Sequence, residues 1–214
     1  MRPTICTAFA TGVIGLVATA ASADIINIQG SSLHSTEGLG AFAGTIEYNF
    51  QSGNYGQLLV DLTNTTSPSI GGFITGFVFN IASPQRSGTD SASLLFSSHP
   101  AIVNIAGPSI SGMPFGLFDA GAGIGAQFEG GASPRGGIAV GATGSFEFRV
   151  SSDHADALSA SSFLSGPNEF DFVVRFRGLA NDGSDKVPAV PVPGSLALLG
   201  AGAMAMGGRR HRPR

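Results

Sequence analysis

Residues 170–177 read Phe-Asp-Phe-Val-Val-Arg-Phe-Arg, an alternation of large apolar side chains with mostly charged ones. Successive side chains of a β-strand point to opposite faces, so this stretch predicts a strand with one apolar face. Residues 145–150, Ser-Phe-Glu-Phe-Arg-Val, repeat the pattern. Both stretches are typical of antiparallel strands that bury their phenylalanines and show charges of both signs to water or to a neighbouring strand.

The same reasoning, extended outward, predicts further strands at residues 25–28, 45–50, 57–62 and 73–81. Residues 73–81 are apolar almost throughout, which favours a central strand inside a sandwich. One or two helical turns are expected at 153–164, and the glycine-rich residues 107–144 are expected to form long loops between strands. The fold prediction is therefore all-β: an antiparallel β-sandwich of jelly-roll type over residues 24–186.

Composition supports this class and excludes others. Gly 32 and Pro 12 of 214 residues disfavour a helix-rich protein, and only 12% of the residues are charged. Residues 24–193 hold six basic and fourteen acidic side chains, a net charge of −8, so we expect no nucleic-acid partner. Sixteen Phe, two Tyr and no Trp suggest aromatic side chains used to fill a core rather than to stack on sugars.

The first 23 residues have the three parts of a secretory signal peptide. Arg2 gives a positive start, residues 8–18 are apolar, and Ala21-Ser22-Ala23 forms a small-x-small cleavage site that would expose Asp24. The expected partners are the Sec machinery and signal peptidase. The alternative is a buried first helix. The only cysteine, Cys6, lies in this segment, so cleavage would leave a chain without disulfides.

The C-terminal end has three parts as well. Residues 187–193 contain Pro188, Pro191 and Pro193, which predict an extended linker outside helix and sheet. Residues 194–208 are apolar or small and would form a helix of about 22 Å, short of a bilayer core of about 30 Å. Residues 209–214 are basic, and Arg209, Arg210 and Arg212 would stop the chain at the cytoplasmic side. A marginal membrane anchor of this kind suits a segment that is inserted transiently and later removed.

This tail resembles the PEP-CTERM sorting signal of exported bacterial proteins. The motif of that family falls on Val190-Pro191-Val192-Pro193, followed by the apolar helix and the arginine cluster, with Val192 in place of the usual Glu. The resemblance implies transient anchoring in the inner membrane, processing by an exosortase-like protease, and a final place at the cell surface or outside the cell. Residues 49–81 and 172–187 are loosely similar to exported surface proteins of this group, which implies no catalytic residues. The alternatives are a chance hydrophobic end or a simple tail anchor.

Catalytic machinery is not evident in the sequence. Glycoside cleavage needs two carboxylates about 5 to 10 Å apart, and no pair stands out among Glu47, Glu129, Glu147 and Glu169. The histidines at 34, 99, 154 and 211 lack the spacing of a zinc site, and there is no G-x-S-x-G elbow. We therefore expect a protein that is not an enzyme and has no organic cofactor.

One cluster of oxygen ligands remains, at Asn181, Asp182 and Asp185. These side chains surround a turn-forming Gly183 and could contribute to a Ca²⁺ site. The alternative is a plain turn, in which Asn and Asp bond to the local backbone.

The sequence thus predicts an exported, non-enzymatic protein of the cell surface or extracellular matrix. The first alternative is a carbohydrate-binding domain for exopolysaccharide, and the second is a secreted hydrolase.

Overall fold

The computed structural model describes residues 24–83, 90–105, 107, 109–130, 132–180 and 182–192. The strands are β1 (Asp24–Gly30), β2 (Phe42–Ser52), β3 (Tyr55–Asn64), β4 (Gly71–Phe79), β5 (Ser91–Ser97), β6 (Ile102–Asn104), β7 (Ile110–Ser111), β8 (Leu117–Phe118), β9 (Ala120–Ile124), β10 (Ile138–Ala139), β11 (Thr143–Ser151), β12 (Phe172–Leu179) and β13 (Ser184–Pro191). Three short 3-10 helices accompany them: η1 (Pro134–Gly136), η2 (Ala155–Ala157) and η3 (Ala160–Phe163). The helical turns expected at 153–164 are thus confirmed as η2 and η3.

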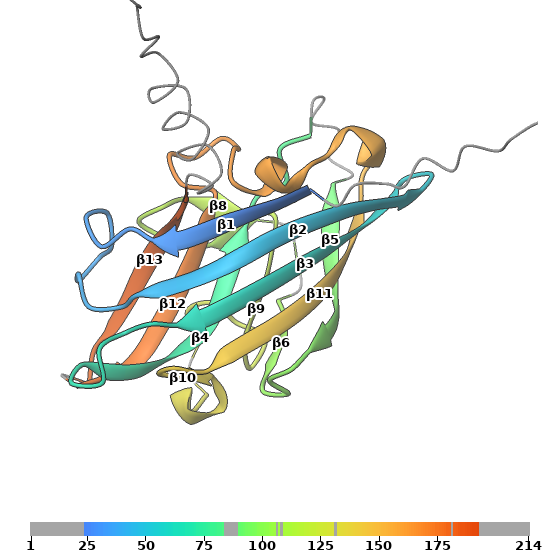
Figure 1. The fold of residues 1–214 in the computed structure, drawn as a ribbon. Coiled ribbons are helices and arrows are strands. Elements are labelled where there is room, and N and C mark those ends of the chain that lie inside the picture. Colours follow the sequence, from blue (N-terminus) through green and yellow to red (C-terminus); the bar gives the residue numbers. More distant parts are fainter. Residues whose placement is uncertain are drawn as a thin grey trace, which may run out of the picture.

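The strands form an antiparallel β-sandwich, as the sequence predicts (Figure 1). One layer has the order β5-β11-β3-β2-β1, and the other has the order β12-β4-β9-β6, with β10 beside β4. β13 pairs with β1 on one side and with β12 on the other, so it joins the two layers. The end strands β5 and β6 are bridged by a hydrogen bond of 2.9 Å from the Leu94 N–H to the side-chain oxygen of Asn104.

Phenylalanines fill the space between the layers. Phe77 of β4 lies 4.9 Å from Phe146 and 5.8 Å from Phe148, ring centre to ring centre, and both partners belong to β11 of the other layer. Phe172 of β12 stacks on Phe77 at 5.6 Å. All four side chains are buried. The prediction that the alternating phenylalanines face a core is therefore confirmed.

The polar face of β12 differs from the prediction that its charges face water or a neighbouring strand, because a loop lies over its two arginines. Residues 128–130 lie over this face. Arg175 is only 8% exposed and donates to the carbonyl of Phe128 at 2.7 Å and to Glu129 at 2.9 Å. Burial lowers the pKa of Arg175, and the charge of Glu129 opposes that shift. Arg177 donates to the carbonyl of Gly130 at 2.6 Å.

The glycine-rich residues 107–144, expected to be loops, include the short strands β7 to β10. β9 is buried along its whole length between β4 and β6. Gly121 explains why this strand needs small residues. A Cβ at Gly121 would lie 2.5 Å from the carbonyl oxygen of Phe77, so a larger residue would push β9 away from β4.

The proline-rich residues 187–193 also differ from the prediction, because β13 continues through Pro191 instead of ending in a linker. Pro188 and Pro191 each stand where a neighbouring strand has stopped. Pro188 accepts a hydrogen bond from Ser31, the residue just after β1. Pro191 pairs with Ile28 of β1. On the side of β12 it has no partner, because β12 begins at Phe172 and its pairing with β13 ends before Pro191. At such positions a strand tolerates the missing N–H of proline.

Both ends of the described chain lie at the same end of the sandwich. The start of β1 and the end of β13 are at the top of Figure 1, near the orange segment that contains η2 and η3. No helix in the ranges that the structure describes is long and apolar enough to cross a membrane. The apolar helix predicted at 194–208 and the basic tail lie outside those ranges.

Candidate functional site

The C-terminal end of the described chain, residues 190–192, is held in the sheet by β1. Val190 pairs with Gln29, and Pro191 pairs with Ile28. The N–H of Val192 donates to the carbonyl of Asn27 at 2.8 Å. The first three residues of the predicted sorting motif are therefore part of the folded domain. Pro193 and the basic residues Arg209, Arg210 and Arg212 lie outside the described residues.

The N-terminal end of the described chain is also part of the sheet. β1 begins at Asp24, the residue that the predicted cleavage would expose, and Asp24 pairs with Tyr48 of β2. Its carboxylate also accepts a hydrogen bond of 2.9 Å from the N–H of Ala160 in η3. Ala21 and Ala23 lie outside the described residues. A cut before Asp24 would leave no spacer ahead of the first strand.

Asp182 and Asp185, both predicted as calcium ligands, differ in burial and in hydrogen-bond partners. Asp182 is exposed, has a φ of 56°, and donates its N–H to the carbonyl of Leu179 at 2.8 Å, as in a turn. Asp185 is completely buried. Asn181 lies outside the described residues.

The carboxylate of Asp185 fastens the loop between β1 and β2. One oxygen accepts from the Thr36 hydroxyl at 2.9 Å and the Glu37 N–H at 3.0 Å, and the other from the N–H groups of Leu39 and Gly40 at 2.8 Å each. Four donors directed at one carboxylate oppose a cation at the same oxygens. Calcium binding stays a prediction, tested by whether a chelator lowers the melting temperature.

Three of the four glutamates considered for glycoside cleavage, Glu47, Glu129 and Glu147, have structural partners. Glu47 accepts from the amide of Asn49 at 2.8 Å. Glu129 forms ion pairs with Arg175 at 2.9 Å and Lys186 at 2.5 Å. Across the part of the chain that the structure describes, no three His, Cys, Asp or Glu side chains are grouped so that they could hold a metal ion.

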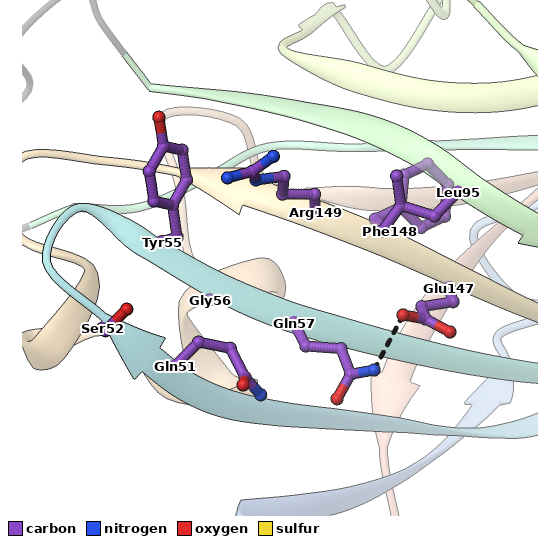
Figure 2. Close-up of a pocket in the computed structure, with 9 residues that line it drawn as sticks. All are labelled: Gln51, Ser52, Tyr55, Gly56, Gln57, Leu95, Glu147, Phe148 and Arg149. Carbon is purple, nitrogen blue, oxygen red and sulfur yellow. Dashed lines mark hydrogen bonds between the residues drawn. The ribbon is translucent and has the colours of Figure 1, made fainter.

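A pocket of about 370 Å³ lies on the outward face of the first layer, near the turn between β2 and β3 (Figure 2). Tyr55 and Arg149 lie side by side there, with the Arg149 guanidinium 4.0 Å from the centre of the Tyr55 ring. Gln57 donates its side-chain amide to Glu147 at 2.8 Å. The sequence predicts an outward face for Glu147 but not this pocket, because only the register of β3 and β11 brings these side chains together.

The C-terminal residues match a known signal. The family model described as the PEP-CTERM protein-sorting motif matches residues 189–212. This chain carries a PEP-CTERM sorting motif. It is therefore an exported protein that depends on an exosortase for C-terminal processing toward the cell surface.

The PEP-CTERM match confirms the resemblance seen in the sequence, and it begins at Ala189, inside β13. The Val192 that replaces the usual Glu is bonded to β1 through its backbone, a contact that does not depend on its side chain. The motif and the sandwich thus share residues 189–191.

Other comparisons add little to the PEP-CTERM assignment. None of the curated proteins matches the sequence. Among solved structures, the chain is similar to biomass-sensing modules from putative RsgI-like proteins of Clostridium thermocellum, described as resembling the family 3 carbohydrate-binding module of the cellulosome. The identity is 9%, the TM-score is 0.33, and the match covers 71% of this chain and 91% of the other. A likeness this weak carries no argument about function.

Proposed function

We propose that the mature protein is a non-enzymatic component of the cell surface or extracellular matrix, and that the sandwich is almost the whole of it. The observation that carries this proposal is the position of the two predicted processing sites. β1 starts at Asp24, directly after the predicted signal peptide, and β13 runs into the PEP-CTERM motif. Signal peptidase after Sec export and an exosortase-like protease would leave the domain with no other part.

A structural or adhesive role also fits the engaged carboxylates. Glu47 and Glu147 each accept a hydrogen bond from a side-chain amide, and Glu129 forms ion pairs with Arg175 and Lys186. A general acid for glycoside cleavage needs a free path to the substrate, which such pairing opposes.

Intact-mass spectrometry of the protein from its native host tests the proposal. We expect a mass that starts at Asp24 and ends at or just after Val192, because a protease needs an extended segment that is free of a sheet. A variant that lacks residues 209–214 should remain uncut and keep residues 193–208, since the basic cluster is part of the signal. A wild-type chain that still ends at Arg214 would overturn the processing model, and the tail would then be a permanent anchor or an unused segment.

Carbohydrate binding is the second candidate function. The pocket on the outward face of the first layer favours it, because the pocket combines an exposed aromatic ring with amide and carboxylate groups. Such a domain would attach the processed protein to exopolysaccharide.

A further inference from the structure

The pocket shown in Figure 2 is built on four adjacent strands, in the order β5-β11-β3-β2. Gln57 of β3 lies opposite Asn49 of β2 and Arg149 of β11 in the register, and Tyr55 lies two residues before Gln57 on the same face. Side chains opposite each other in antiparallel strands are within reach of one another. The pocket is therefore fixed by strand pairing rather than by a loop.

The Tyr55 ring has one defined orientation. The guanidinium of Arg149 lies over it at 4.0 Å, a cation–π contact, and the tyrosine side chain is still 43% exposed. An aromatic ring held in place but open to solvent can receive an apolar surface at small entropic cost.

The rest of the lining supplies hydrogen bonds. Gln57 donates a hydrogen bond of 2.8 Å to Glu147, and the side chain of Gln51 lines the same pocket. Each amide both donates and accepts, and the carboxylate accepts more than one bond. Leu95 adds an apolar side. The volume of about 370 Å³ lies within the range of about 300–1,000 Å³ that is usual for small-molecule sites.

We propose that this pocket binds neutral sugar units of a polysaccharide. A sugar ring has an apolar face of C–H groups for Tyr55 and hydroxyl groups for the amides and the carboxylate. Among the lining residues, Glu147 is the one acid and Arg149 the one base, and each already has a partner, which favours a neutral sugar over a uronic acid. The inference rests on the second candidate function, because it names the site and ligand class for carbohydrate binding.

The test is affinity electrophoresis of the host-processed protein through gels that contain neutral glucans, galactans or mannans, beside gels that contain uronic-acid polymers. We expect a neutral polymer to retard the wild-type protein. Tyr55→Ala should weaken that binding about tenfold through loss of the stacking surface. Gln57→Leu removes the side-chain amide but keeps an apolar side chain at this position, and it should weaken binding roughly fivefold through loss of hydrogen bonds.

Phe50→Ala is the matched control. Phe50 is 42% exposed, close to the value for Tyr55, but it lies on the other face of β2 and does not line the pocket. We expect its binding to equal that of the wild type. Melting curves of all variants identify any loss that is due to unfolding, and Gln57→Leu tests the site if Tyr55→Ala does not fold.

Three results would overturn the inference: no retardation by any neutral polymer, retardation by uronic-acid polymers alone, or equal loss in Phe50→Ala and Tyr55→Ala. The failure of the processing model is a separate observation. A correctly processed chain that binds no sugar removes the pocket's role and leaves the surface protein. A chain that binds sugar but still ends at Arg214 keeps the pocket and removes the processing.

Discussion

Asp185 connects two segments that are far apart in the sequence. It lies on β13, is completely buried, and accepts four hydrogen bonds from residues 36–40. Asp185→Asn replaces one acceptor oxygen with an NH₂ group that faces two donors, so we expect a loss of about 3 kcal/mol in the free energy of unfolding. Urea denaturation measures it.

Asp182→Asn makes the same chemical change at an exposed turn position three residues away. Asn tolerates the positive φ of Asp182, so the free energy of unfolding should change by less than about 0.5 kcal/mol. Equal losses in the two variants would contradict the anchoring role of Asp185.

Tyr48 gives the fold a dependence on alkaline pH. Its hydroxyl donates to the carbonyl of Ala155 at 2.7 Å, and burial, with a smaller contribution from the charge of Asp156, raises its pKa to about 12. An unfolded tyrosine ionises near pH ~10. The unfolded chain therefore releases its proton first, so this stability is complete below that pH and is lost as the pH rises through about 12.

Tyr48→Phe removes both the hydroxyl and its ionisation. We expect about 1 kcal/mol lower stability at neutral pH, from the lost hydrogen bond, and a flatter decline above pH ~10. Urea unfolding over a pH series measures both effects. An equally steep decline in the variant would assign the alkaline sensitivity to another group.

At the scale of elements, a separate layer covers the outward face of the second sheet. β7 and β8 pair only with each other, and Phe118 of β8 belongs to a second apolar cluster that also contains Val78 of β4 and Val173 of β12. Phe118→Ala should increase amide hydrogen exchange at residues 109–118 and leave β2, β3 and β11 unchanged, because the main core lies on the other face.

Leu117→Ala serves as the control for that experiment. Leu117 is 55% exposed, whereas Phe118 is 1% exposed. Exchange in the control should match the wild type. Faster exchange throughout the sandwich in Phe118→Ala would mean that the cover and the core unfold as one unit.

Alternation predicted some strands well and others not at all. Residues 145–150 and 170–177 have phenylalanine or valine at every second position, and both form strands, although the second begins only at Phe172. β9 consists of Ala, Gly and Ile, so it has no alternation of polar and large apolar side chains that would indicate a strand. β13 contains two prolines, and sequence alone does not show that the neighbouring strands end beside them.

At the scale of the whole molecule, the two candidate sites differ in how far the sequence predicts them. The sorting motif is contiguous, so its order of residues can be recognised directly. The pocket depends on Tyr55 and Arg149, which are distant in the chain and meet only through the register of β3 with β11. No local pattern specifies that register.

The place of β13 between the two layers also has a consequence for timing. A chain that is made and exported from its N-terminus delivers β1 first and β13 last, and such long-range pairing is slow to form. Until residues 184–191 have emerged, β1 has no second partner and β12 lacks its neighbour on the β1 side. The next residues to emerge belong to the sorting tail. Closure of the sandwich and arrival of the tail at the membrane are therefore consecutive events, so an incompletely folded chain reaches the processing step with its last strand still unpaired.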